Sequence, residues 1–511
     1  MKLRFRASII AVTATLLLAA CGPDISGRND RPAERGSADF STFVAIGDSL
    51  TAGYADSALY LHGQENSYPA IMAQQFALAG GGDFTQPLMP VGATGKLSLT
   101  GSTEIGNLTN DRLMLSATGN PESPAAPITI SPTQTTPIDT RVGNGGYNNL
   151  GVPGAKLYHV PFPGYGTLSA PVIDAGGANP FFARFSSSDA TSMLTDALAL
   201  GATFFVLWVG NNDILLYAAD GGTGVDQTDN PNVTTYGPEN DITDPGFFEN
   251  GFAALGLPSY AGMVAALTAG GAKGVLINMP DVTSIPYFKT VPFNPVELTA
   301  AEADMLNMNP TVIQYNAGIA SQAGVTISQE EADLRHLVWV EGINPVLITD
   351  DELTDLSGGG LPSIRLATAA DLILLPTSRK IGMDNGAGLL WGVSVALEDG
   401  DVLSEAEAGF VEAARQRYNA AIKTTADASP DLLYFDAAAK LTELDQTGIL
   451  YGSGGVSSTF AQGGFFSLDG IHPTARGNAV LANEIFKLIN EAFDAYIPPV
   501  DPSDYTTVFY Q

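Results

Sequence analysis

The chain has 511 residues and a formal net charge of −31, and so acidic a surface repels nucleic acid and anionic head groups, which argues against nucleic acid as a partner. Apolar residues make up 45% of the sequence and include 24 Phe and 17 Tyr, so a substantial core can be buried. The single cysteine excludes an internal disulfide.

The N-terminus has the features of an export signal. Lys2, Arg4 and Arg6 precede an apolar stretch over residues 9–20 that is too short to span a bilayer. This stretch ends in Leu-Ala-Ala-Cys, which resembles a bacterial lipoprotein signal, where cleavage precedes the Cys and the Cys is acylated. The alternative is an ordinary secretory signal with an incidental Cys. We favour the lipoprotein, because Cys21 is the only cysteine and stands where lipidation requires one.

Residues 1–20 are therefore predicted to be a lipoprotein signal peptide. Residues 21–38, the lipidated Cys followed by a polar segment with Pro and Gly, are predicted to form a flexible tether. The protein is expected to be exported and lipid-anchored to a bacterial membrane. The residue after the lipidated Cys is Gly22, whereas many inner-membrane retention signals have Asp at this position. By this resemblance, the outer membrane is favoured.

Beyond the tether, short apolar runs alternate with segments of helical spacing. The runs are typical of buried parallel strands and comprise residues 42–46, 203–209, 273–278 and 432–436. Helices are predicted at residues 68–78, 193–200 and 260–269, from the capping box at 404–407 to about residue 426, and from Pro473 to about residue 497. This alternation predicts an α/β fold, a three-layer α/β/α sandwich with a parallel sheet.

The predicted domain covers residues 39–500, followed by a C-terminal tail at 501–511, and two segments within it depart from the alternating pattern. Residues 80–145 are rich in Gly, Thr, Pro and Ser and are interpreted as long loops with short strands. Residues 285–400 contain β-like runs and are predicted to form a β-rich inserted subdomain. Because ligands bind beyond the carboxyl ends of parallel strands, this insertion either caps the active site or packs at a distance.

Four short segments carry residues suited to hydrolytic chemistry. They are residues 47–50 (Gly-Asp-Ser-Leu), 149–151 (Asn-Leu-Gly), 210–213 (Gly-Asn-Asn-Asp) and 469–472 (Asp-Gly-Ile-His). Ser49 directly follows a predicted strand, so it lies at the carboxyl edge of the sheet with its own N–H at a helix N-terminus. Gly-Asp-Ser alone is usually a turn, and the buried strand before it strengthens the functional interpretation.

The candidate general base is His472. The chain has 4 histidines, and only His472 has an Asp three residues upstream, between the last strand and the final helix. This separation lets Asp469 accept a hydrogen bond from Nδ1 while Nε2 faces Ser49. The others, His62, His159 and His336, are interpreted as ordinary surface or loop histidines, with substrate contact as the alternative for His159.

These segments resemble the sequence blocks of the SGNH/GDSL hydrolase superfamily, whose members are esterases, lipases, thioesterases and carbohydrate deacetylases on a flavodoxin-like α/β/α fold. The resemblance implies that Ser49 is the nucleophile and that Asp469 orients His472. It also implies an oxyanion hole made by the Ser49 N–H, the Gly151 N–H and the Asn212 side chain. The resemblance covers the sheet units and does not account for most of residues 80–145 and 285–400.

Each of these assignments has a structural alternative. Gly151 lies in Gly-Val-Pro-Gly, which a tight turn alone explains, and Asn212 ends a buried strand, where an Asn often caps a loop. The spacing Gly-x-Asn-Asp selects Asn212 over Asn211. Asp48 and Asp213 are predicted to brace their loops rather than to react.

The resulting prediction is a serine esterase or lipase that hydrolyses carboxylic esters through an acyl-enzyme at Ser49. No cofactor and no catalytic metal are expected. The acidic loop 226–244 and residues 399–401 suggest Ca²⁺, but neither has EF-hand spacing. Two alternatives stay open: a carbohydrate acetylesterase with the same chemistry, and a non-catalytic surface lipoprotein that binds glycans or a protein partner. The expected substrate is an ester of a lipid or an acylated carbohydrate.

Overall fold

The computed structural model of the protein describes residues 31–105, 109–116, 127–130, 135–143, 145–232, 240–252, 255–452 and 454–510. The predicted signal peptide, Cys21 and the first part of the tether lie outside these residues. Two compact units are distinguished, one formed by Pro32–Thr290 with Glu405–Gln511 and the other containing Val291–Ser404. In the described part of the chain, no helix combines the length and apolar character needed to cross a bilayer.

The first unit is built on a five-stranded sheet in the order β15-β8-β7-β1-β6, with all neighbours parallel. The strands are β1 (Phe43–Gly47), β6 (Asn149–Gly151), β7 (Phe204–Trp208), β8 (Lys273–Ile277) and β15 (Leu432–Phe435). Every residue of β1 and β7 is buried, as expected for strands that are covered on both faces. The predicted parallel sheet is therefore confirmed, and β6 is an edge strand that the sequence pattern did not reveal.

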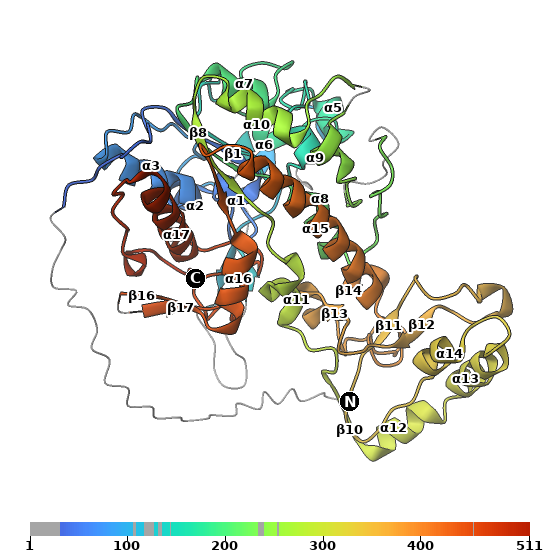
Figure 1. Cartoon of the computed structure of the whole chain (residues 1–511). Helices are drawn as coiled ribbons and strands as arrows, with labels where there is room; N and C mark the ends of the chain where they lie inside the picture. Colours follow the sequence, from blue (N-terminus) through green and yellow to red (C-terminus); the bar gives the residue numbers. More distant parts are fainter. Residues whose placement is uncertain are drawn as a thin grey trace. The chain divides into compact units, whose positions relative to one another are not determined.

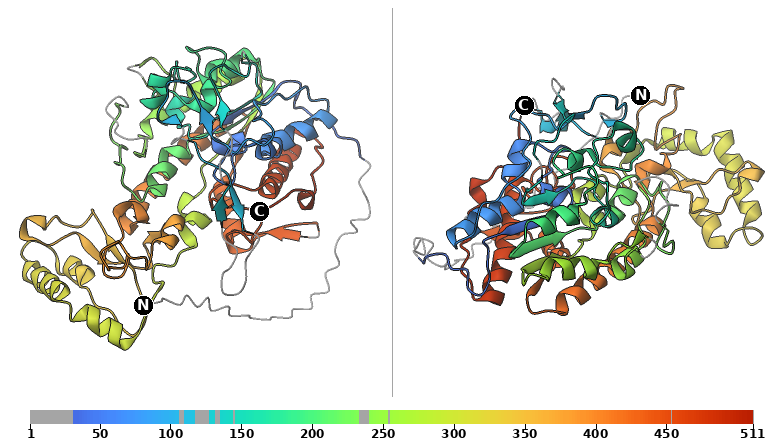
Figure 2. Two further views of the ribbon diagram at one scale, coloured as in Figure 1. Left: turned by 180° about the vertical axis from the view of Figure 1, so that it is seen from behind. Right: turned by 90° about the horizontal axis from the view of Figure 1, so that it is seen from above.

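Helices cover both faces of this sheet (Figure 1). On one face lie α3 (Tyr68–Leu78) and α17 (Ala475–Phe493), which are neighbours in space although far apart in the chain, as Figure 2 also shows. Their apolar residues pack on alternate residues of the strands to form the main core. On the other face lie α7 (Met193–Ala199), α10 (Tyr260–Thr268) and α15 (Glu405–Asp427). The result is an α/β/α layering compatible with the predicted sandwich.

Local sequence explains where these helices begin. Ser67, Ser192, Ser259 and Thr474 each cap a helix by accepting a hydrogen bond from a backbone N–H of its first turn. The remaining helices of this unit are short: α1 (Ser49–Ala52), α2 (Leu61–Glu65), α5 (Ala170–Asp174), α6 (Pro180–Ala183), α8 (Asn212–Ala219), α9 (Gly246–Asn250), α11 (Pro286–Lys289) and α16 (Ala437–Gln446).

Residues 80–145 form loops with short strands where the structure describes them, as predicted. The short strands of this unit are β2 (Leu97–Ser98), β3 (Leu113–Leu115), β4 (Pro127–Thr129), β5 (Thr136–Pro137), β16 (Ile449–Tyr451) and β17 (Gly454–Val456). The predicted C-terminal tail belongs to the folded unit instead. The Phe509 carbonyl accepts a hydrogen bond from Leu115 N at 2.8 Å, and the Arg112 guanidinium lies 4.0 Å from the Phe509 ring centre.

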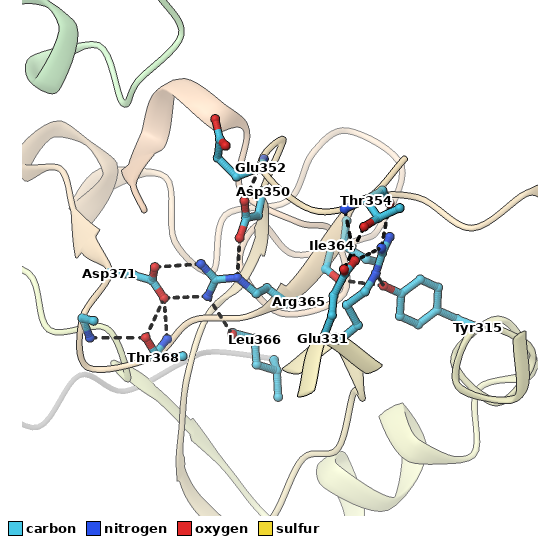
Figure 3. A network of polar contacts seen from close by, with 12 residues as sticks. Tyr315, Glu331, Asp350, Glu352, Thr354, Ile364, Arg365, Leu366, Thr368 and Asp371 are labelled. Atoms are coloured by element: carbon cyan, nitrogen blue, oxygen red, sulfur yellow. Dashed lines mark hydrogen bonds and ion pairs between the residues drawn. The ribbon is translucent and has the colours of Figure 1, made fainter. Parts of the chain in front are cut away.

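The second unit differs from the β-rich subdomain that was predicted, because helices outweigh its strands. It contains α12 (Ala300–Asn307), α13 (Pro310–Gln322) and α14 (Gln329–Arg335), and strands of two or three residues: β9 (Val296–Leu298), β10 (Gly342–Asn344), β11 (Leu347–Thr349), β12 (Ile364–Leu366), β13 (Leu372–Ile373) and β14 (Val402–Leu403). A separate apolar core includes Trp339 and Ile348. Beside this core, the Arg365 guanidinium donates to Asp350 at 2.5 Å and to Asp371 at 2.6 and 2.8 Å (Figure 3). Whether this unit acts as a cap stays a prediction.

Candidate active site

Three of the predicted site residues meet in a chain of hydrogen bonds. Ser49 Oγ lies 2.9 Å from His472 Nε2, and His472 Nδ1 lies 3.0 Å from Asp469 Oδ2. All three side chains are buried, with residue exposures of 7% or 8%. Ser49 is the first residue of α1, just beyond the carboxyl end of β1, and the other two lie in the loop that leads into α17.

Asp469 shapes the loop that carries the histidine. Its Oδ1 accepts the N–H groups of Ile471 and His472, each at 2.9 Å, while its Oδ2 accepts the Ser57 N–H at 2.9 Å. Gly470 has a φ of 73°, a conformation that glycine adopts without strain. Burial by itself would raise the pKa of Asp469, but the charge of His472 and these donors lower it to about 2. The carboxylate is therefore ionised beside the imidazole at neutral pH.

The turn that presents Ser49 is fixed by its neighbours. Asp48 Oδ1 accepts the Leu50 N–H at 3.0 Å, and Oδ2 accepts Asn211 Nδ2 at 2.8 Å. These bonds confirm the bracing role predicted for Asp48. Burial raises the pKa of Asp48 to about 6, against the effect of these donors. A Cβ on Gly47 would lie 2.4 Å from the Trp208 carbonyl oxygen, so only glycine fits between β1 and β7.

A second brace joins the residues after β6 to α8. Asp213 Oδ2 accepts the Leu157 N–H at 2.8 Å, which confirms the predicted bracing role, and burial raises its pKa to about 6. Asn212 Nδ2 donates to the Ala155 carbonyl at 3.0 Å, which leaves its second N–H unassigned. Ser49, Asn212 and His472 all line one cavity. Both braces thus hold Asn212 at the reactive atoms.

The predicted oxyanion donors are only partly available. In the described residues, the Ser49 N–H has no acceptor. The Gly151 N–H, by contrast, donates to Asn149 Oδ1 at 2.9 Å, so this amide is engaged within its own strand. Three residues further on, Gly154 has a φ of 79° and an N–H with no acceptor in the described residues. A tight turn in Gly-Val-Pro-Gly was expected from the sequence, but the Gly154 N–H was not considered as a donor, although the place of Gly154 directly after Pro153 is typical of such a turn.

The other histidines take no part in this arrangement. His159 is buried rather than at the surface, accepts the Lys156 N–H on Nδ1 at 3.0 Å and stacks on Tyr165. Burial, with a smaller effect of the Lys156 charge, lowers the pKa of His159 to about 3, so this ring is neutral and structural. His62 Nε2 lies 2.8 Å from Thr506 Oγ1, and His336 is exposed at the end of α14.

Three of the acidic residues in the segments considered for Ca²⁺ accept hydrogen bonds from protein donors. Asp241 accepts Val225 N and Gln227 Nε2, each at 2.8 Å, and Asp244 accepts Gly246 N at 2.8 Å. Residues 233–239 of this loop lie outside the described residues. In the second unit, Asp401 accepts a hydrogen bond from Lys380 Nζ at 2.5 Å.

Comparisons with protein-family models, with curated proteins and with solved structures found no match for this chain.

Proposed function

We propose that the chain is a serine hydrolase of the SGNH/GDSL type that cleaves carboxylic esters. The hydrogen-bonded series Ser49–His472–Asp469 carries the proposal, because it joins a nucleophile, a base and an orienting carboxylate at bonding distances. Numbered along the chain, the five sheet strands have the flavodoxin-like order 2-1-3-4-5. Ser49 and Asn212 follow its first and third strands, where ligands bind in such sheets.

The proposed reaction has two halves. Ser49 Oγ attacks the ester carbonyl carbon while His472 Nε2 takes the hydroxyl proton, and Asp469 stabilises the imidazolium. His472 then protonates the alkoxide leaving group, which departs as an alcohol and leaves an acyl-enzyme. Water attacks this ester with the same base, the carboxylic acid is released, and the serine regains its proton.

The negative charge on the tetrahedral oxygen needs hydrogen-bond donors that are not already bound to another acceptor. The Ser49 N–H and the second N–H of Asn212 meet this requirement. Because the Gly151 amide is engaged, the proposal assigns the third donor to the Gly154 N–H. Losing one such donor costs about 10²–10³ in kcat.

The first experiment measures hydrolysis of p-nitrophenyl esters by the protein and by Ser49→Ala, together with labelling by a fluorophosphonate. We expect turnover that is abolished in Ser49→Ala and a label that peptide mass spectrometry places on Ser49. Ser41→Ala, at an exposed serine outside the site, is the matched control. Full activity in Ser49→Ala, or a label on another residue, contradicts the proposal. Absence of both turnover and label favours the non-catalytic binding protein.

A further inference from the structure

A cavity of about 90 Å³ begins at the reactive atoms and has an almost wholly apolar wall. Ser49, Asn212 and His472 line it, and its other walls include residues of α16, β16 and α17, together with Trp208 of β7 and Phe435 of β15. The wall includes Leu441, Leu444, Ile449, Phe466, Val480 and Leu481, which are all buried. Apolar groups favour such a wall, because contact with it removes apolar surface from water. The position of this cavity beside the nucleophile points to a ligand that fills it.

The cavity extends from the catalytic histidine to Glu484 on α17. Its lining includes His472 and Pro473 before the helix and Val480, Leu481 and Glu484 on it, and with a rise of 1.5 Å per residue the lining part of the helix, from Val480 to Glu484, spans roughly 6 Å. Glu484 Oε2 lies 3.0 Å from Lys440 Nζ, and both residues line the cavity. An acyl chain that reaches this ion pair would have to desolvate it, so we expect the pair to limit the length of chain that the cavity accepts.

We propose that this cavity holds the acyl chain of the substrate, so that the enzyme prefers medium-chain acyl esters to acetyl esters. The inference rests on the proposed hydrolase function. A water-sized group needs roughly 10–15 Å³ of such a volume, so the cavity accommodates about six to nine groups of that size. An acetyl group fills only its first part. The acyl group is also the part of an ester that stays on Ser49 through both halves of the reaction, so it benefits most from a fixed apolar site.

The magnitude follows from the transfer of methylene groups out of water. Each methylene that enters the cavity is expected to raise kcat/KM about fourfold. The increase stops once the chain reaches the Lys440–Glu484 pair. We therefore expect kcat/KM to rise along p-nitrophenyl esters from acetate to about octanoate, and to level off or fall with longer acids.

Two neighbouring residues of β16 provide a matched pair of variants. Ile449 lines the cavity and is 8% exposed, whereas Leu450 is 86% exposed and does not line it. Ile449→Trp fills part of the cavity, so its preferred acid should be shorter, while Ile449→Ala should shift the preference to longer acids. Leu450→Trp should keep the wild-type chain-length profile. Because misfolding would not shift the preferred acid length in opposite directions, the two substitutions at Ile449 distinguish a change of cavity size from misfolding. Circular dichroism spectra check the fold of each variant.

A binding measurement separates the cavity from the chemistry. Calorimetric titration of Ser49→Ala with 1-octanol should show binding, which is lost when Ile449→Trp is added and kept when Leu450→Trp is added. Ser49-dependent turnover that is highest on acetate, or that depends on the length of the alcohol in alkyl acetates rather than of the acid, overturns the acyl-chain assignment and leaves the hydrolase. Octanol binding without turnover of any ester overturns the hydrolase and supports only the apolar-chain site. If neither octanol binding nor ester turnover is detected, the acyl-chain site and the hydrolase proposal are both overturned.

Discussion

The Asp469 carboxylate contacts both the loop backbone and the imidazole of His472. One oxygen holds the loop through the N–H groups of Ile471 and His472, and the other faces the imidazole. The loop geometry therefore depends on an acceptor at Oδ1. The tautomer of the His472 imidazole depends on an ionised acceptor at Oδ2. A substitution that preserves the first and removes the second separates the two roles.

Asp469→Asn is that substitution. We expect a loss of about 10⁴-fold in kcat, because the amide cannot accept the Nδ1 proton and the imidazole adopts the wrong tautomer. The thermal unfolding temperature should fall only modestly, since the asparagine oxygen can still accept both loop N–H groups while its amide no longer accepts the Ser57 N–H. Steady-state kinetics and calorimetry on this variant and on the exposed control Asp304→Asn measure both effects. A kcat within tenfold of wild type would show that Asp469 does not orient the base.

At the scale of elements, buried hydrogen bonds join the strands' carboxyl ends to one another. Asp48 links the start of α1 to Asn211, and Asp213 links the start of α8 to the residues after β6. Both carboxyl groups are fully buried behind the reactive atoms, so positioning these loops has an electrostatic cost.

That cost makes stability depend on pH through Asp213. Burial raises its pKa to about 6, above the value of about 3.9 in an unfolded chain, so the folded chain binds this proton more tightly. The stabilisation by this proton is complete below the unfolded pKa and is lost as the pH rises through 6. Between pH 5 and pH 8, the free energy of unfolding of wild type should fall by roughly 1–1.5 kcal/mol relative to that of Asp213→Asn. Urea unfolding of both proteins at the two pH values measures this difference, and a constant difference contradicts the assignment.

The elements differ in how well the sequence predicts them. The strands β1, β7, β8 and β15 could be predicted because each contains a run of apolar residues, which in β1 and β7 is buried on both faces. Strand β6 was missed, since its three residues include Asn149 and Gly151, which strands disfavour. In the second unit, α12 was missed although Thr299 and Glu302 form a capping box, because apolar runs further along the segment, at 337–340 and 372–375, were interpreted as strands.

The candidate site shows the same division. Ser49, Asp469 and His472 could be assigned because their chemistry and their order along the chain are both restrictive. The donor at Gly151 was assigned from the resemblance alone, and nothing in the sequence indicates that Asn149 occupies this amide. The cavity could not be predicted, because its wall joins apolar residues of α16, β16 and α17 that look like ordinary core positions.

At the scale of the whole molecule, the chain combines two compact units with a predicted lipid attachment at Cys21. The prediction rests on the sequence at the N-terminus, which lies outside the described residues. Acylation of both the sulfur and the amine of a cysteine adds several alkyl chains, and more than one chain is needed for stable anchoring.

Cys21→Ala should therefore release the protein from the membrane. In the host, wild type should fractionate with membranes and incorporate labelled palmitate, whereas Cys21→Ala should do neither. Ser26→Ala, in the same predicted tether, is the control and should behave as wild type. Membrane association of Cys21→Ala equal to that of wild type would contradict lipid anchoring at this residue.

The hydrogen bond between Ser49 and His472 joins positions that are 423 residues apart. During synthesis and export, the nucleophile emerges near the beginning of the chain and its base near the end. A nascent or truncated chain therefore carries a serine with no partner to remove its proton, and the proposed activity begins only when export is almost complete. For the proposed hydrolase, with the predicted export signal, this order along the chain would keep the activity off until almost the whole polypeptide has crossed the membrane.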